Sequence, residues 1–144
     1  MQDTSPGAGA VIALDLGGTK IAGAVLEPGG RILATGQLPT PAAAGAAAIC
    51  DAAAQLVSSL RADCPVTVRG LGLGSAGVID PATARVLSAT DTLTGWAGTD
   101  LAAELGERAG LEVRAVNDVH AHGLGEARFG AGRDAAQVLL LAVG

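Results

Sequence analysis

Apolar and polar residues alternate in short runs over the first 40 positions of the chain. The run Val11-Ile12-Ala13-Leu14 is almost unbroken, which is typical of a strand buried on both faces. Further apolar runs follow after glycine-containing turns, so the pattern predicts three strands, over residues 10–16, 20–27 and 31–37. Because the turns are short, we expect these strands to form an antiparallel meander. Residues 1–9 are polar and are expected to form a disordered lead.

From residue 40 onward, helical and strand patterns alternate. Apolar residues between Ile49 and Leu60 repeat at helical spacing, which predicts a helix with one face on the sheet. Thr40 and Pro41 are residue types favoured at the N-cap and the first helical position, so the helix is expected to begin there and to end near Ala62. This order predicts an α/β fold, with a mixed sheet and flanking helices. The other expected elements are strands over 66–74, 112–116 and 138–143, a short strand within 81–87, a helix capped by Thr99 or Asp100 and ended by Gly110, and a helix over 119–129 ended by Gly130.

The composition narrows the classes of protein to which the chain can belong. With 144 residues, 49% of them hydrophobic, the chain is long enough for one domain with a substantial core. The net charge of −5 argues against a nucleic-acid interface, which needs clustered Lys and Arg. No run approaches the roughly 18 apolar residues of a membrane helix, and the acidic, polar start is unlike a signal peptide. We therefore expect a cytoplasmic protein without a membrane partner, in which the isolated Cys50 and Cys64 are reduced and form no zinc site.

A turn with several phosphate-binding groups joins the first two expected strands. Gly17 and Gly18 let backbone N–H groups approach an anion, because no Cβ stands in the way. Thr19 and Lys20 add a hydroxyl group and a positive charge, and Asp15 has the oxygen ligands that Mg²⁺ or its waters prefer. The alternative is an ordinary Gly-Gly hairpin with a solvated Asp and Lys, but Lys20 is the only lysine in the chain, which favours a phosphate site. The spacing matches neither a Walker loop nor a dinucleotide-binding fingerprint.

The pair Asn117-Asp118 follows an expected strand and precedes an expected helix. The carboxyl ends of strands are where open α/β sheets place their ligands, and a carboxylate there can accept the proton of an attacking hydroxyl group. From position alone, the alternative that Asp118 is simply the N-cap of the helix is favoured. The two roles do not exclude each other.

Two loops carry weaker signals. Residues 74–80, which read GSAGVID, form either a tight turn or a segment whose backbone lies close to a polar ligand such as a sugar. Residues 90–96 carry hydroxyl groups and the only tryptophan, Trp96, for which packing is favoured over a sugar platform.

His120 and His122 suggest a metal site, but their spacing argues against one. Residues two apart on a helix point about 200° away from each other, so the two imidazoles cannot bind one ion together. We interpret both as ordinary polar residues.

Three segments in the same order and at the same intervals resemble the ROK family (repressors, open reading frames, kinases) of bacterial sugar kinases, and in particular its glucokinases, within the actin-like ATPase superfamily. The segments are Leu14–Ile21, Gly72–Asp80, and Asn117-Asp118 followed by Gly125-Glu126. The resemblance runs from about Ala10 to Gly144 and covers the front half of a family member. It implies an actin-like ATPase (ribonuclease H-like) fold whose mixed five-stranded sheet starts with three antiparallel strands. It also implies an N-terminal domain over 10–117 and the start of a second, truncated domain over 118–144.

The resemblance implies the ATP-dependent phosphorylation of a hydroxyl group on a hexose or an N-acetylhexosamine. Asp118 would be the catalytic base, and Asp15 would hold Mg²⁺ through water. ATP and Mg²⁺ would bind at Asp15, Gly17, Gly18, Thr19 and Lys20, and the sugar at Gly77, Val78, Thr90, Asn117 and Asp118. Ala76, where the family often has Pro, and Val119-His120, where it usually has Ala-Asn, leave the identity of the sugar open.

The resemblance also implies parts that the chain does not contain. The second phosphate loop should begin at Gly144, and the structural zinc site should lie in the missing C-terminal part. The chain alone is therefore expected to be almost inactive, and a homodimer is possible. The main alternative is a non-catalytic, sugar-sensing regulatory module of the ROK family. A repressor is disfavoured because only about ten polar residues precede the first phosphate turn, and another actin-like ATPase is disfavoured by the spacing of Asn117-Asp118 from GSAGVID.

Overall fold

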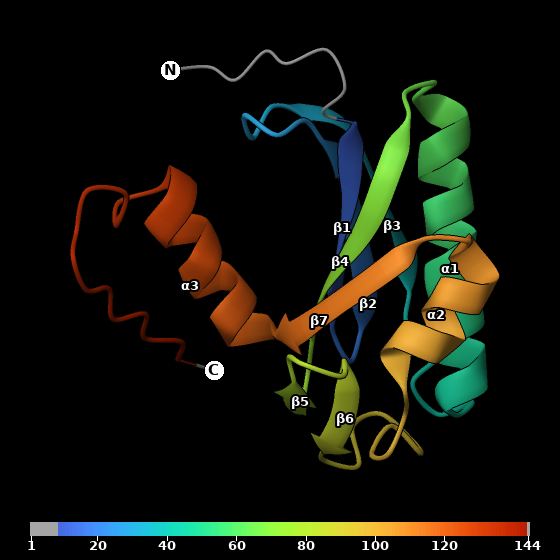
Figure 1. Cartoon of the computed structure of the whole chain (residues 1–144). Coiled ribbons are helices and arrows are strands. Elements are labelled where there is room, and N and C mark those ends of the chain that lie inside the picture. The colour runs from blue at the N-terminus through green and yellow to red at the C-terminus, as the bar shows by residue number, and fades with distance from the viewer. Residues whose placement is uncertain (1–8, 144) are drawn as a thin grey trace.

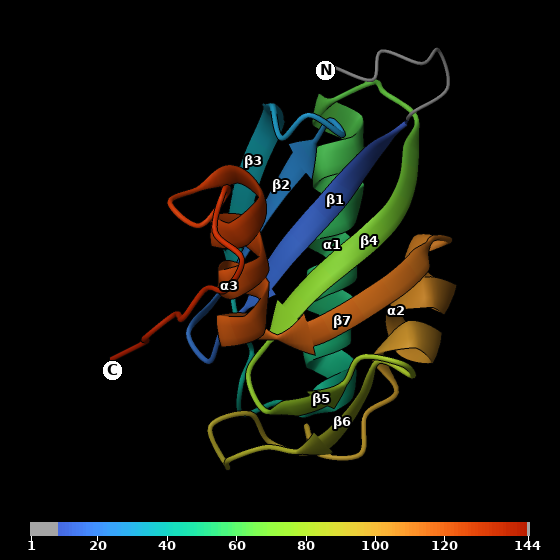
Figure 2. The same ribbon diagram turned by 60° about the vertical axis from the view of Figure 1, so that its left-hand side comes forward.

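The computed structural model describes residues 9–143 and shows one mixed five-stranded sheet with helices on both faces (Figure 1). The strand order is β3-β2-β1-β4-β7, and Figure 2 shows these strands side by side in this order. A second sheet contains only β5 and β6. The elements are β1 (Ala10–Leu16), β2 (Lys20–Leu26), β3 (Ile32–Pro39), α1 (Ala46–Asp63), β4 (Val68–Ser75), β5 (Val78–Asp80), β6 (Arg85–Ser88), α2 (Leu101–Ala109), β7 (Glu112–Asn117) and α3 (Asp118–Phe129).

The sheet combines an antiparallel half with a parallel half. Strands β1, β2 and β3 form the expected antiparallel meander, whereas β4 pairs parallel with β1, and β7 pairs parallel with β4. In this register Leu16 lies opposite Ser75, and Ser75 lies opposite Asn117. The carboxyl ends of β1, β4 and β7 therefore meet at one edge of the sheet.

The hydrophobic core lies between the sheet and the helices α1 and α2, which cover the same face (Figure 1). In β1, Ile12, Leu14 and Leu16 are buried in this core, while the residues between them face the other side. Gly23 of β2 lets α1 approach closely, because a Cβ there would lie 2.8 Å from the Leu14 side chain and 2.9 Å from that of Leu60. The apolar face predicted for α1 is confirmed: Ile49, Ala53, Leu56, Val57 and Leu60 are all buried.

Trp96 connects the segment after β6 with the end of β4 through a buried hydrogen bond. Its side chain is fully buried, and its Nε1–H donates a hydrogen bond of 2.9 Å to Oγ of Ser75. Ser75 is the one buried polar residue among residues 9–143, and its hydroxyl donates in turn to the carbonyl of Ala76 at 3.0 Å. The expectation that Trp96 packs in the core is therefore confirmed.

Helix α3 lies against the opposite face of the sheet from α1 and α2 (Figures 1 and 2). None of its residues is buried. Its first turn packs against β4, and at its other end the Phe129 ring lies beside Gly30 in the turn between β2 and β3. Among residues 9–143, no helix is long and apolar enough to span a membrane.

The expected start of α1 at Thr40 is wrong. The helix begins at Ala46, after a turn over residues 41–44, and its N-cap is Gly45 with φ 92°. Thr40 instead pairs with the turn between β1 and β2, because its hydroxyl donates to the carbonyl of Gly17 at 2.8 Å. A contact with a distant segment thus replaces the local capping role.

The strand expected over residues 138–143 is also wrong. These residues form no strand and are mostly exposed, because no sheet edge lies beside them to pair with their backbone. The segment GSAGVID was expected to be a turn or loop, but its last three residues, Val78–Asp80, form the strand β5, which pairs with β6. Apart from Gly9, the predicted lead over residues 1–9 lies outside the described residues.

The boundaries of the two later helices follow their capping residues. Of the two expected N-caps of α2, Asp100 is the one used, because its carboxylate accepts from the N–H of Ala103. Gly110 ends α2 in the left-handed conformation, as expected. Gly130 ends α3, as expected.

The buried bond between Trp96 and Ser75 predicts a measurable loss of stability. We expect Ser75→Ala to lower the free energy of unfolding by about 1–3 kcal/mol, because it leaves the buried indole N–H without an acceptor. Urea unfolding followed by circular dichroism measures the loss. The same change should cost less in a Trp96→Phe background, where no N–H is left unpaired, and equal losses in both backgrounds would contradict the assigned bond.

Candidate active site

Two loops and the first turn of α3 meet where the parallel strands end. They follow Leu16, Ser75 and Asn117, which the register places in one row. Two hydrogen bonds connect the loops: the N–H of Ala76 donates to the carbonyl of Leu16 at 3.4 Å, and Nδ2 of Asn117 donates to the carbonyl of Gly77 at 2.8 Å. The three motifs found in the sequence therefore form one continuous surface.

Asn117, not Asp118, is the N-cap of α3. Its Oδ1 accepts from the N–H of Val119 at 3.0 Å and, more weakly, from that of His120 at 3.4 Å. The interpretation of Asp118 as the N-cap is therefore wrong. Asp118 is half-buried, and its Oδ1 accepts from the N–H of Val119 at 2.8 Å, which leaves Oδ2 without a hydrogen-bond partner among residues 9–143.

Gly74 sets the position of Asp118 over the sheet. A Cβ on Gly74 would lie 3.1 Å from the Cβ of Ala121 and 3.5 Å from the Cα of Asp118, so glycine lets the first turn of α3 pack closely on β4 without displacement. Gly74 also pairs with Asp15 across β1 and β4. Asp15, predicted to hold Mg²⁺, and Asp118, predicted to be the catalytic base, thus start from neighbouring backbone positions.

The turn predicted to bind phosphate is held in place by contacts with distant residues. Its backbone closes through the N–H of Gly17, which donates to the carbonyl of Lys20 at 3.0 Å. Thr40 holds the turn twice, through its hydroxyl on the carbonyl of Gly17 and through its N–H, which donates to the carbonyl of Thr19 at 2.9 Å. Lys20 is exposed and makes no ion pair within residues 9–143, so its charge is free to meet an anion.

The residues predicted to bind sugar lie next to this turn. Gly77 has φ 99°, and a Cβ there would lie 2.6 Å from the carbonyl oxygen of Ser88, so the position requires glycine. Val78 pairs with Ser88 and is exposed. Thr90 lies two residues after Ser88, and Asn117 is bonded to the carbonyl of Gly77. The predicted sugar-binding residues therefore lie around the same end of the sheet.

Thr92 connects the predicted sugar side to the predicted phosphate side. Its hydroxyl accepts a hydrogen bond of 3.1 Å from the hydroxyl of Thr90. Its methyl carbon Cγ2 lies 2.6 Å from the position of a Cβ on Gly18. Sequence reasoning missed Thr92 and Thr40, because both act through contacts with residues that are far away along the chain.

Asp80, the last residue of GSAGVID, has a local structural role. Its carboxylate accepts from the hydroxyl of Thr83 at 2.8 Å and from the N–H of Ala82 at 3.0 Å. These hydrogen bonds, first of all that from Thr83, lower the pKa of Asp80. Asp80 therefore stabilises the turn before β6.

Asp15 is suited to hold a magnesium ion. Its side chain is 54% exposed at the end of β1, beside the phosphate turn. Residues 9–143 contain no group of three His, Cys, Asp or Glu side chains that could hold a metal on their own. A cation bound with a nucleotide does not need such a group, because Mg²⁺ commonly takes one or two carboxylates and completes its shell with water and phosphate oxygens.

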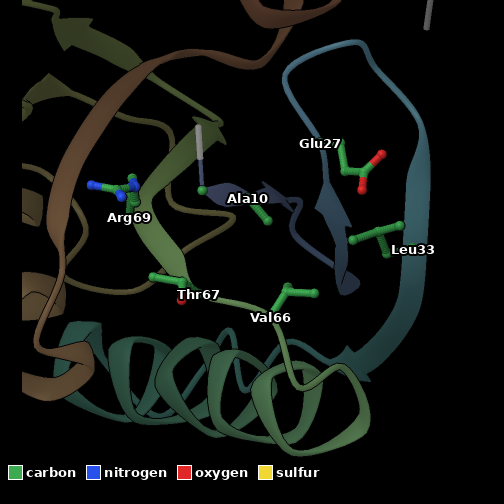
Figure 3. Close-up of a pocket in the computed structure, with 7 residues that line it drawn as sticks. Ala10, Glu27, Leu33, Val66, Thr67 and Arg69 are labelled. Atoms are coloured by element: carbon green, nitrogen blue, oxygen red, sulfur yellow. The ribbon is translucent and has the colours of Figure 1, made fainter. Parts of the chain in front are cut away.

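A cavity lies at the other end of the sheet. It has a volume of about 330 Å³ and lies beside the start of β1 (Figure 3). The candidate site lies beside the end of that strand. Its one carboxylate, that of Glu27, is already paired with Arg31 at 2.8 Å. The lining residues are Gly9, Ala10, Glu27, Leu33, Val66, Thr67 and Arg69.

Comparisons with known proteins assign the chain to a family. The model of the ROK family matches residues 11–144. The chain belongs to the ROK family. It is similar to a glucokinase of Streptomyces coelicolor, with 34% identity over 94% of this chain, and to an N-acetylmannosamine kinase of Salmonella newport, with 36% identity over 76% of it. It spans only 41% and 36% of these two relatives.

A solved ROK structure supports the same assignment. The crystal structure of a ROK glucokinase from Streptomyces griseus, in complex with glucose and AMPPNP, matches 88% of this chain with 38% identity and a TM-score of 0.79, over 38% of its own length. The expected actin-like ATPase fold, with its mixed five-stranded sheet and flanking helices, is therefore confirmed for this ROK chain.

The close packing at Gly74 predicts that a side chain there displaces α3. We expect Gly74→Val to cost about 1–3 kcal/mol of stability and to shift the backbone amide NMR signals of Asp118 and Ala121, because the new side chain collides with the first turn of α3. Gly72→Val is the matched control on the same strand and face, since the nearest atom to its Cβ would be the carbonyl oxygen of Ile12 at 4.0 Å. Equal shifts of the α3 signals in both variants would contradict the assigned role of Gly74.

The contact between Gly18 and Thr92 predicts a rescue. We expect Gly18→Ala to lower the free energy of unfolding by about 1–3 kcal/mol, because the added methyl group overlaps with the Thr92 side chain. Adding Thr92→Ser removes the opposing methyl group and keeps the hydroxyl, so the double variant should recover most of the loss. Denaturant unfolding measures both values, and a double variant no more stable than Gly18→Ala would show that the two residues do not meet.

Proposed function

We propose that the ROK protein containing this chain transfers the γ-phosphoryl group of ATP to a hydroxyl group of a hexose or an N-acetylhexosamine. One observation carries the proposal. Asp118, whose Oδ2 has no hydrogen-bond partner among residues 9–143, lies between a turn suited to phosphate and a rim of neutral polar groups suited to a sugar. The likeness to glucokinases and to an N-acetylmannosamine kinase supports it.

The proposed mechanism assigns a task to each group of residues. Backbone N–H groups of Gly17 and Gly18, the hydroxyl of Thr19 and the ammonium of Lys20 hold the phosphates. Asp15 holds Mg²⁺ through water, and the bound ion supplies positive charge against the triphosphate. Catalysis then rests on the in-line alignment of the acceptor hydroxyl with the phosphoryl group.

The sugar side holds the acceptor hydroxyl against the proposed base. The loop with Gly77 and Val78 and the hydroxyl of Thr90 surround the sugar, and Asn117 fixes the Gly77 loop while also capping α3. Asp118 orients the hydroxyl that attacks and accepts its proton as the bond to phosphorus forms. Because Asn117 holds both the loop and the helix, the sugar rim and the base keep a fixed separation.

The chain supplies one side of this site. We propose a domain boundary between Asn117 and Asp118, where β7 ends and α3 begins. The second phosphate loop and the structural zinc site that the family resemblance implies belong to the part of a ROK protein that this chain does not span. We place the protein in the cytoplasm: Cys50 and Cys64 are both free and buried, and burial raises the pKa of Cys50 to about 11, which keeps its thiol unreactive.

Replacement of the proposed base tests the function. In the product of the full reading frame that contains residues 1–144, we expect Asp118→Asn to lower turnover by about 10²–10⁴-fold, because the amide cannot accept the proton. ADP release is measured with glucose, N-acetylmannosamine, N-acetylglucosamine and fructose. The control is Asp134→Asn, an exposed carboxylate that lies outside the site.

The outcomes of this assay separate the candidate functions. Sugar-dependent ADP release that Asp118→Asn removes and Asp134→Asn leaves intact supports the kinase. Near-normal turnover in Asp118→Asn would remove Asp118 from its role. Sugar binding without any ADP release would indicate a regulatory ROK module instead.

A further inference from the structure

His122 faces the carboxylate that we assign to the cation. Nε2 of His122 lies 3.7 Å from Oδ2 of Asp15, although the two residues come from α3 and β1. Both side chains are partly open to solvent, at 62% and 54% exposure. His122 follows Asp118 by one turn of α3, so both side chains share the face of the helix that meets the end of β1.

The distance between the two atoms leaves room for a cation that Asp15 reaches through water. At 3.7 Å, nitrogen and oxygen are too far apart for a good hydrogen bond. The distance is also longer than the about 3.0–3.4 Å between two ligands that each lie about 2.1 Å from one ion at angles of about 90–110°. It therefore suits an imidazole that binds the ion directly and a carboxylate that holds it through a water molecule. Among residues 9–143, His120 makes no such approach to a carboxylate.

We propose that His122 coordinates the divalent cation that accompanies the nucleotide and that Asp15 holds through water, and that the imidazole gives this site a preference for Mn²⁺ over Mg²⁺. The proposal rests on the proposed function, because phosphate oxygens and water complete the coordination. Its chemical basis is the choice of ligand: Mg²⁺ favours oxygen alone, whereas Mn²⁺ and the later transition metals also accept imidazole nitrogen.

The surroundings of the pair favour a cation. Asp118, on the same face of α3, adds a second negative charge near the site. Gly74, between the strand that carries Asp15 and the helix that carries His122, has no side chain to separate them. The described residues supply only this imidazole and this water-linked carboxylate, so the site needs a nucleotide to reach full affinity.

Direct metal binding tests the proposal without kinase turnover. Free Mn²⁺ is measured by electron paramagnetic resonance in solutions of the full-length protein, with and without AMPPNP, and Mg²⁺ affinity is measured by competition. We expect His122→Ala to weaken Mn²⁺ binding about tenfold in the presence of AMPPNP, and to change Mg²⁺ binding less than about twofold. His120→Ala is the matched control and should bind both ions like the wild type, while Asp15→Asn should weaken both.

Each result decides for or against the proposal. Mn²⁺ affinity that is unchanged in His122→Ala, an equal loss for both ions, or no Mn²⁺ binding by the wild type would overturn it. Circular dichroism of each variant shows whether the fold is kept, and His122→Gln provides a second variant that retains a polar side chain but lacks the imidazole nitrogen. If Mn²⁺ binding depends on His122 but no sugar-dependent ADP release occurs, the metal site stands and the kinase proposal fails.

Discussion

Parallel pairing of β1 with β4, and of β4 with β7, brings Leu16, Ser75 and Asn117 into one row across the sheet. Every group assigned to the site depends on this alignment, because the phosphate turn, the Gly77 loop and Asp118 each begin within two residues of the row. The bond between Asn117 and Gly77, and the buried bond between Trp96 and Ser75, then fix the loops to the strand ends. A shift of one residue in either pairing would turn alternate side chains to the other face and separate these groups.

Sequence patterns predicted the helices and strands whose formation depends only on the residues of the segment itself. The apolar run in β1 and the helical spacing between Ile49 and Leu60 were sufficient to predict these two elements. The expected burial of β1 on both faces is wrong, because its residues alternate between buried and more exposed positions and Val11 is 43% exposed. The segment 138–143 shows the limit of this reasoning. Its apolar residues indicated a strand, but a strand also needs a partner edge, and the sequence of a segment does not say whether one is present.

The candidate site could be predicted where residues that are close in sequence act together, as in Asp15 to Lys20. It could not be predicted where the decisive contact joins distant segments. Thr40 stands directly before Pro41, as a helix N-cap often does, yet its hydroxyl donates a hydrogen bond to the carbonyl of Gly17. His122 was set aside because it cannot bind an ion together with His120, but the residue opposite His122 is Asp15.

Helix α3 has no buried side chain, yet it carries Asp118 at one end and contacts the turn at Gly30 at the other. Its 12 residues span about 18 Å, so a rotation of about 10° at the Asn117 cap would move the far end by about 3 Å while Asp118 hardly moves. Asp118 therefore lies at the end of α3 where a rotation of the helix would displace it least, while the contact between Phe129 and Gly30 holds the other end beside the turn between β2 and β3. The position of the proposed base is thus the least sensitive to the angle at which the helix leaves the sheet.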